Sequence, residues 1–235
     1  MVCSLHGVIL AAGLGTRLRP LTYIVPKALL PLGDKTVIEH IINWFKKYDI
    51  NHIIIATSYL SRVIENYLGN GEWLGVKIEY AHGAPLGTGG QLYTLKNLVN
   101  ETFIVTYGDS ITNLDLKSMI KFHKEHNAVV TIAVAPINIK IKYGVIKFDA
   151  QGKFQEWEEK PSRKELVNIG VYVMEPKIFN YLDGKIKPMN ELILQMAKNN
   201  EPIYVFSSDA SFDDIGDYQE FIEINNKYTE KLGKI

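Results

Sequence analysis

The 235-residue sequence contains a single cysteine, Cys3, which excludes an internal disulfide. A chain without disulfides suits a reducing compartment, and we expect the protein in the cytoplasm. Long hydrophobic runs are also missing. Runs such as residues 8–12 contain a handful of residues, far fewer than the ~20 that a membrane-spanning helix needs. No basic segment precedes them, so the sequence predicts neither a membrane span nor a secretory signal.

An excess of charge of either sign is lacking as well. Lys plus Arg and Asp plus Glu both number 26, which gives a formal net charge of +0 at pH 7. This balance provides no overall field to attract nucleic acid or an anionic membrane, so neither is expected as a partner. Internal repeats, low-complexity tracts and linkers are absent too, and the length fits one domain over residues 1–235.

The first half of the chain alternates short apolar runs with amphipathic stretches. Buried strands are predicted at residues 7–12, 53–55, 76–80 and 103–107. Helices are predicted between them, at residues 37–45, 60–68 and 91–98. This order is typical of a parallel sheet covered by helices.

From about residue 128 the pattern changes to strands joined by short connections. These strands are predicted at residues 129–135, 143–148, 153–158 and 168–174, with helices returning at residues 190–198 and 218–231. Short connections imply antiparallel additions to the sheet. We therefore expect an α/β fold: a Rossmann-like three-layer sandwich with a mixed, mostly parallel sheet.

The most informative segment follows the first predicted strand. In Gly13-Leu14-Gly15 the missing side chains let backbone N–H groups approach phosphate oxygens. Two common phosphate-binding motifs are excluded, because Leu18 stands where the dinucleotide fingerprint needs a glycine and no Gly-Lys pair is followed by Ser or Thr. Three cations follow the loop and can converge on a polyphosphate: Arg17, Arg19 and Lys27.

The segment from Leu10 to Pro31 resembles the signature of the sugar-phosphate nucleotidyltransferases, the sugar-nucleotide pyrophosphorylases. Further segments resemble the other motifs of that family, in the family's order. They are a nucleoside-binding loop at residues 85–90, a metal site at residues 107–109, sugar-phosphate segments at residues 143–146, 159–161 and 168–172, and a second metal motif at residues 214–216. The resemblance implies that a nucleoside triphosphate and a sugar 1-phosphate give a nucleotide-sugar and pyrophosphate, with Mg²⁺ as cofactor.

The resemblance also implies roles for individual residues. The nucleotide would be bound by Leu10, Ala11, Gly13, Gly15, Thr16, Arg17, Gly87 and Thr88. The sugar phosphate would be bound by Gly144, Glu159, Lys160, Asn168 and Gly170. Catalytic positive charge would come from Arg17, Lys27 and Lys160, and Mg²⁺ would be held by Asp109 and Asp214.

Sequence position also favours a metal role for these two aspartates. Asp109 follows an apolar strand and a glycine, which places it at the carboxyl end of a strand, where open α/β sheets bind ligands. Asp115 and Asp217 are better placed to cap the helices that follow, so Asp109 and Asp214 stay free. Two carboxylates with substrate oxygens and waters form the oxygen shell that Mg²⁺ prefers.

The sequence does not determine the nucleobase, the sugar or the oligomeric state. A homo-oligomer is possible. Gly83 stands where some relatives carry a Gln or Glu that reads the base edge. Residues 85–90 look most like the mannose- and heptose-1-phosphate guanylyltransferases, which favours guanine. The alternative is a thymidylyl- or uridylyltransferase acting on glucose 1-phosphate.

Two other classes of protein remain as rivals. The first is a catalytically silent regulatory subunit that binds nucleotide-sugar, although Arg17, Lys27, Asp109, Lys160 and Asp214 are all present. The second is a metal-dependent glycosyltransferase, whose usual pair of aspartates is missing because Ser110 follows Asp109.

Overall fold

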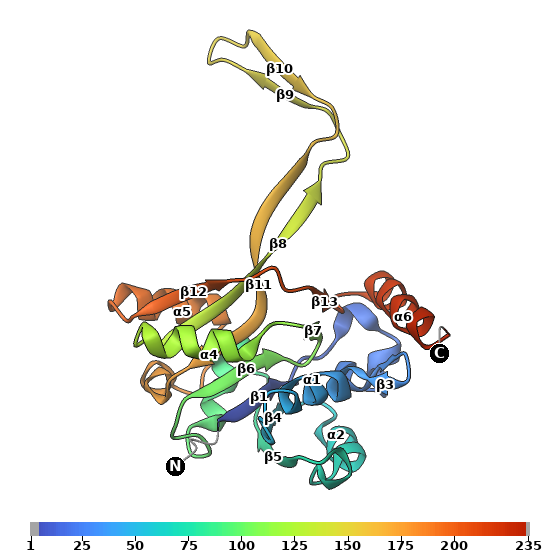
Figure 1. The fold of residues 1–235 in the computed structure, drawn as a ribbon, viewed down its shortest axis with the longest axis vertical. Helices are drawn as coiled ribbons and strands as arrows, with labels where there is room; N and C mark the ends of the chain where they lie inside the picture. The colour runs from blue at the N-terminus through green and yellow to red at the C-terminus, as the bar shows by residue number, and fades with distance from the viewer. Residues whose placement is uncertain (1–4, 234–235) are drawn as a thin grey trace.

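The computed structural model describes residues 5–233 as an α/β fold built on a seven-stranded sheet with the strand order β12-β8-β11-β6-β1-β4-β5 (Figure 1). Strand β1 (His6–Leu10) runs parallel to its two neighbours, β4 (His52–Thr57) and β6 (Phe103–Tyr107). Strand β5 (Lys77–His82) extends this parallel group beyond β4. These four strands are the ones predicted from the first half of the sequence.

The other three strands of the sheet come from the second half of the chain. Strand β11 (Ser162–Met174) runs antiparallel to β6 and to β8 (Val130–Lys140). Strand β12 (Ile203–Ser207) pairs parallel with β8. The mixed, mostly parallel sheet is thereby confirmed. Strand β12 was not predicted, because its apolar run from Ile203 to Phe206 is too short to be assigned to a strand by periodicity.

Helices cover both faces of this sheet. Because successive side chains of a strand point to opposite faces, Ile9 joins the core under α1 (Val37–Lys46), whereas Val8 and Leu10 join the core under α5 (Met189–Lys198). The three-layer sandwich is confirmed. The other α-helices are α2 (Ser61–Leu68), α3 (Gly87–Gly90), α4 (Leu116–Glu125) and α6 (Tyr218–Leu232).

Short elements connect these layers. Three two-stranded sheets are formed by β2 (Pro31–Leu32) with β3 (Lys35–Thr36), β7 (Ser110–Thr112) with β13 (Phe212–Asp214), and β9 (Val145–Phe148) with β10 (Phe154–Glu158). The 3-10 helices are η1 (Thr16–Leu18), η2 (Leu21–Tyr23), η3 (Lys27–Leu29), η4 (Glu72–Leu74), η5 (Gln91–Leu95) and η6 (Pro176–Tyr181). Within residues 5–233, no helix is long and apolar enough to cross a membrane.

The helix expected at residues 91–98 begins and ends earlier in the chain. Its first turn is the glycine-rich α3, and η5 continues it. A Cβ on Gly90 would stand 2.6 Å from the carbonyl oxygen of Lys185, and one on Gly89 would stand 2.9 Å from that of Pro188. These glycines let the helix backbone lie directly against the loop before α5.

Residues 138–166, here called the arm, project from the body of the protein as a long hairpin (Figure 1). The outer halves of β8 and β11 form its stem, and β9 and β10 form its tip. No residue of the arm is buried. From their short connections, the strands predicted at residues 143–148 and 153–158 were expected to join the main sheet. Instead they pair with each other in a sheet of their own.

Candidate active site

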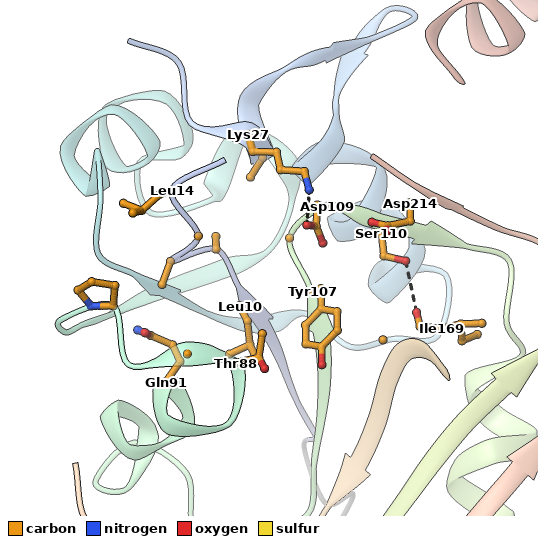
Figure 2. A pocket seen from close by; sticks show the side chains of 18 of the residues that line it. Leu10, Leu14, Lys27, Thr88, Gln91, Tyr107, Asp109, Ser110, Ile169 and Asp214 are labelled. Carbon is orange, nitrogen blue, oxygen red and sulfur yellow. Dashed lines mark hydrogen bonds and ion pairs between the residues drawn. The ribbon is translucent and has the colours of Figure 1, made fainter. Parts of the chain in front are cut away.

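A cavity of about 440 Å³ opens at the edge of the sheet where β1 and β6 end (Figure 2). The volume is typical of small-molecule sites, and the carboxyl ends of strands are where open α/β sheets bind ligands. The cavity is lined by residues 10–14, 27–28, 107–110 and 168–170, together with Pro85, Gly87, Thr88, Gln91, Phe212 and Asp214.

The cavity brings together ten of the residues that the sequence analysis assigned to the site. They are Leu10, Ala11, Gly13, Lys27, Gly87, Thr88, Asp109, Asn168, Gly170 and Asp214. Three more lie just beyond the lining: Gly15 before η1, and Thr16 and Arg17 within it. Gly144, Glu159 and Lys160 lie on the arm, outside the cavity of their own chain.

The glycine-rich loop after β1 uses its two glycines differently. No atom of the described residues lies within 4 Å of the place where a Cβ on Gly13 would stand, so Gly13 leaves space open at the cavity wall. Gly15 has a φ of 58°, and its carbonyl accepts a 2.7 Å hydrogen bond from the hydroxyl of Thr22. A Cβ on Gly15 would stand 2.8 Å from Cγ2 of Thr22. Gly15 therefore fixes the shape of the loop, and Gly13 leaves room for a ligand to approach the loop backbone.

An ion pair joins the start of η3 to the segment that follows β6. The Nζ of Lys27 lies 2.5 Å from Oδ2 of Asp109, and the two side chains are 14% and 32% exposed. Gly108 donates its N–H to the carbonyl oxygen of Leu10 at 2.9 Å, which ties the end of β6 to the end of β1. Lys27 is therefore a positioned cation in the cavity and not a solvated surface residue.

A short antiparallel ladder brings Asp214 to Asp109. In the pairing of β13 with β7, Asp214 stands opposite Ser110. The N–H of Ile215 donates to the carbonyl oxygen of Asp109 at 3.0 Å. Figure 2 shows Lys27, Asp109 and Asp214 at one end of the cavity, which thus collects one cation and two carboxylates from three distant parts of the sequence.

The environment of Asp214 disfavours its charge. Partial burial raises the pKa of the Asp214 carboxyl above its usual value, repulsion from Asp109 raises it further, and Lys27 and Arg17 oppose the rise. The guanidinium of Arg17 lies against the backbone beyond Asp214, with Nη1 3.4 Å from the place of a Cβ on Gly216. Arg17 thus flanks the carboxylate end of the cavity from outside its lining.

The two carboxylates fit Mg²⁺, which takes oxygen ligands and completes its shell with water and phosphate oxygens. A divalent cation would relieve the repulsion between Asp109 and Asp214 that contributes to the raised pKa of Asp214. Among residues 5–233, no group of three or more His, Cys, Asp or Glu side chains could hold a metal. The pair suits an ion shared with a bound phosphate better than a closed site made only of protein ligands.

The floor of the cavity is a hydrogen-bonded network on β11 and β6. Asn168 donates from Nδ2 to the hydroxyl of Tyr172 at 2.6 Å, and its Oδ1 accepts from the N–H of Gly170 at 2.9 Å. The hydroxyls of Tyr172 and Tyr107 lie 2.9 Å apart. Gly170 has a φ of 75°, and the register of β11 against β8 shifts there. This bulge turns residues 168–170 into the cavity.

Among the lining residues that were given no individual role from the sequence, three carry polar side chains: Gln91, Tyr107 and Ser110. The side chain of Gln91 is the most informative, because its residue is 2% exposed and neither polar atom of its amide has a hydrogen-bond partner among the described residues. The only signal in the sequence was its place directly after Gly87-Thr88-Gly89-Gly90.

Comparison with known proteins agrees with this geometry. The family model described as "Nucleotidyl transferase" matches residues 6–231, which is nearly the whole chain. The chain belongs to the nucleotidyl transferase family.

Individual members of the nucleotidyl transferase family differ in base and sugar. A D-glycero-alpha-D-manno-heptose 1-phosphate guanylyltransferase of Campylobacter jejuni is 35% identical, covering 94% of this chain and 100% of that protein. A UTP–glucose-1-phosphate uridylyltransferase of Synechocystis sp. is 30% identical over 92% of this chain, which spans only 61% of that relative's length. The crystal structure of HddC from Yersinia pseudotuberculosis complexed with GMP-PN has a TM-score of 0.75 and 25% identity, covering 97% of this chain and 99% of that one.

The two glycines of the first loop predict opposite effects. We expect Gly13→Ala to fold with an unchanged Tm and to bind nucleoside triphosphate at least tenfold more weakly, because the added methyl enters open cavity space. Gly15→Ala should lower the Tm, since it combines a positive φ with a clash at Thr22. Thermal denaturation and calorimetric titration with nucleotide check both results. A Gly13→Ala variant with full nucleotide affinity would contradict the role of this loop.

The raised pKa of Asp214 predicts a stability effect with a definite sign. A carboxyl whose pKa is higher in the folded than in the unfolded state is penalised once it ionises, and the penalty vanishes below the unfolded-state pKa. In EDTA at neutral pH, Asp214→Asn should therefore raise the Tm slightly, and the difference from wild type should disappear in acid. Activity that requires Mg²⁺ should be lost.

The neighbouring Asp213 provides a matched control for this experiment. Its carboxylate is held by Nζ of Lys227 at 2.7 and 2.8 Å and does not line the cavity. Asp213→Asn should lower the Tm and retain Mg²⁺-dependent activity. An unchanged or lower Tm for Asp214→Asn in EDTA would refute the electrostatic description of the pair.

Proposed function

We propose that this protein is a sugar-1-phosphate nucleotidyltransferase that converts a nucleoside triphosphate and a sugar 1-phosphate into a nucleotide-sugar and pyrophosphate. The observation that carries the proposal is the grouping of Lys27, Asp109 and Asp214 at one end of a cavity whose wall is the Gly13 loop. A polyphosphate is bound by backbone N–H groups that it can approach closely, by positive charge and by carboxylates that hold a metal ion. The cavity combines these three features. Membership of the nucleotidyl transferase family supports the same reaction.

The reaction is an in-line displacement at phosphorus. An oxygen of the sugar phosphate forms a bond to the α-phosphorus as the bond from that phosphorus to the bridging oxygen of the leaving pyrophosphate breaks. The attacking phosphate monoester is largely dianionic at neutral pH, since its second pKa is ~6. The chain therefore needs no side chain to remove a proton, and its work is positioning and charge stabilisation.

Different residues of the site would bind the nucleotide, the metal ion and the sugar phosphate. Lys27 would exchange Asp109 for an oxygen of the α-phosphate, where negative charge develops during the displacement. The Gly13 loop and Arg17 would hold the departing pyrophosphate. Asp109 and Asp214 would hold Mg²⁺, which supplies positive charge that screens the repulsion between the two phosphate substrates. Lys160 would neutralise the sugar phosphate, with Glu159 on a sugar hydroxyl and Gly144, Asn168 and Gly170 lining the sugar subsite.

We infer guanine as the base and a mannose- or heptose-type 1-phosphate as the acceptor. Support comes from the C. jejuni heptose 1-phosphate guanylyltransferase, which this chain matches over the relative's whole length, and from the HddC structure with a bound guanine nucleotide analogue. The Synechocystis uridylyltransferase supports the alternative of uracil and glucose 1-phosphate.

Pyrophosphate release from a panel of substrates tests the proposal. With Mg²⁺, we expect release from GTP with mannose 1-phosphate or a heptose 1-phosphate, and no release when either substrate is omitted or EDTA is added. Release only from UTP or dTTP with glucose 1-phosphate would replace the guanylyltransferase assignment by its alternative. Binding of nucleotide-sugar without release from any pair would identify a regulatory subunit and overturn the proposed activity.

Replacement of Lys27 tests the catalytic role of its charge. If Lys27 acts mainly on charge that develops in the transition state, Lys27→Ala should lower kcat by on the order of 10²–10³ and change KM for the nucleotide much less. Lys27→Arg should restore activity only in part, because a planar guanidinium cannot place a point charge at the same position. Lys35→Ala, which removes an exposed partner of Asp34, is the matched control with wild-type kcat expected. Wild-type kcat in Lys27→Ala would refute the mechanism.

A further inference from the structure

The arm carries an apolar face that remains exposed among the residues the structure describes. In the tip, Ile146 pairs with Trp157 and Phe148 pairs with Phe154. Directly paired residues share one face of a ladder, so these four side chains, here called the tip face, lie together. They are between 40% and 65% exposed.

The opposite face of the tip is ionic. Lys147 contacts Glu156 at 2.7 Å and Glu158 at 2.5 Å, and Glu158 also pairs with Arg163 at 2.7 Å. The tip is thus an amphipathic two-stranded hairpin. An isolated hairpin of this kind is marginally stable in water, and a clustered apolar face of this kind marks an interaction surface.

The arm also holds site residues away from the cavity of its own chain. The ladder of β11 with β8 is unbroken from Asn168 opposite Val134 to Ser162 opposite Lys140. Six strand steps of about 3.3 Å separate Asn168 from Ser162 by about 20 Å. Lys160 lies farther out still, beyond the reach of its own side chain to the cavity floor. The cavity therefore lacks the cation assigned to the sugar phosphate.

We propose that two copies of this chain exchange their arms, so that each arm carries Glu159 and Lys160 to the cavity of the other copy. This inference rests on the proposed function for the role of Lys160. The exchange is a two-fold contact in which the same surfaces are used twice, so it closes as a dimer. It supplies the missing cation to both cavities and leaves each stem ladder intact.

The body offers an apolar rim that suits the tip face. Ile24 is 75% exposed and lies in the loop that leads to Lys27, and Ile186 is 74% exposed. The residue after Ile186, Lys187, donates its N–H to Leu86 at 2.8 Å, which attaches this loop to the Gly87 side of the cavity. Leu14, 41% exposed, lies in the cavity wall, in the glycine-rich loop after β1. A second copy docked at this mouth covers both apolar surfaces at once.

Sedimentation velocity tests the dimer without reference to activity. We expect the wild-type chain to sediment as a dimer, and Phe148→Ser combined with Phe154→Ser to sediment as a folded monomer. Leu194→Ser combined with Val205→Ser removes two apolar side chains of similar exposure from α5 and β12 and should remain dimeric. A wild-type monomer at micromolar concentration, or a dimer that survives loss of the tip face, would overturn the exchange whatever the enzyme assay returns.

Complementation between two inactive variants tests whether the arm acts in the other copy. Lys27→Ala and Lys160→Ala chains with different tags are co-expressed, and the mixed dimer is isolated through both tags. Arm exchange leaves one of the two cavities with both lysines, so the mixed dimer should regain about half of the wild-type rate of pyrophosphate release. A rate no higher than that of either parent dimer would show that each arm serves its own cavity. Absence of release by the wild-type enzyme would instead refute the proposed function, and sedimentation would still decide the exchange.

A second inference comes from the opposite end of the cavity. Figure 2 shows Gln91 well away from Lys27 and Asp109. Its amide lies beside Gly83, where the place of a Cβ is 3.7 Å from Nε2. Both polar atoms of the amide lack partners among the described residues, and a buried polar group without a partner is costly.

We infer that the amide of Gln91, which lines the cavity, recognises the nucleobase. The inference rests on the proposed function. An amide donates with its nitrogen and accepts with its oxygen, which matches the adjacent carbonyl and ring N–H of guanine or of uracil. With the phosphates at the Lys27 end, the base of a bound nucleotide lies toward Gln91.

Calorimetric titration of Gln91→Leu separates base recognition from phosphate binding. We expect GTP to bind at least tenfold more weakly, because the base loses two hydrogen bonds, and inorganic tripolyphosphate to bind with wild-type affinity. Gln219→Leu, on the exposed surface of α6, is the control and should bind both normally. Unchanged GTP affinity, or equal losses for GTP and tripolyphosphate, would overturn the role of Gln91. A wild-type protein that binds no nucleoside triphosphate would refute the proposed function itself.

Discussion

The parallel pairing of β1 with β6 is the constraint on which the cavity depends. Leu10 stands opposite Tyr107 at the ends of these strands, so both chains leave the sheet at the same edge. One continues into the glycine-rich loop and the other into Asp109. The hydrogen bond from Gly108 to Leu10 extends this alignment one residue beyond the ladder. Every other group of the site is placed relative to these two strand ends.

Two later segments add the remaining chemistry through local irregularities. Asp214 reaches Asp109 through the three-residue ladder of β13 with β7, which lies outside the main sheet. Asn168 and Gly170 reach the cavity because β11 bulges where Gly170 takes a positive φ. A Cβ on Gly170 would stand 2.6 Å from Cδ2 of Tyr107, so only glycine allows this strand to lie so close to β6.

The features that could be predicted from the sequence are those that depend on short-range residue patterns. The strands β1, β4, β5 and β6, the glycine-rich loop and the position of Asp109 at a strand end all follow from hydrophobic periodicity and motif spacing. The contacts that depend on long-range pairing were out of reach. No local signal shows that Asp214 would meet Ser110, or that the amide of Gln91 would remain without a partner. The two strands of the hairpin at residues 143–158 were predicted. The residue pattern and the short turn indicate that two strands pair, but they do not show where in the fold the pair lies.

The central place of β11 in the sheet has a consequence for the synthesis of the chain. The parallel strands β1, β4, β5 and β6 are all made before β11, which is the second neighbour of β6. Until residue 174 has been made, the outer edge of β6 has no partner, although Phe103, Ile104 and Val105 are fully buried in the finished protein. An unpaired edge with apolar side chains is a template for pairing with other chains. A nascent chain stalled between residues 107 and 171 therefore leaves this edge unpaired and is expected to be prone to aggregation.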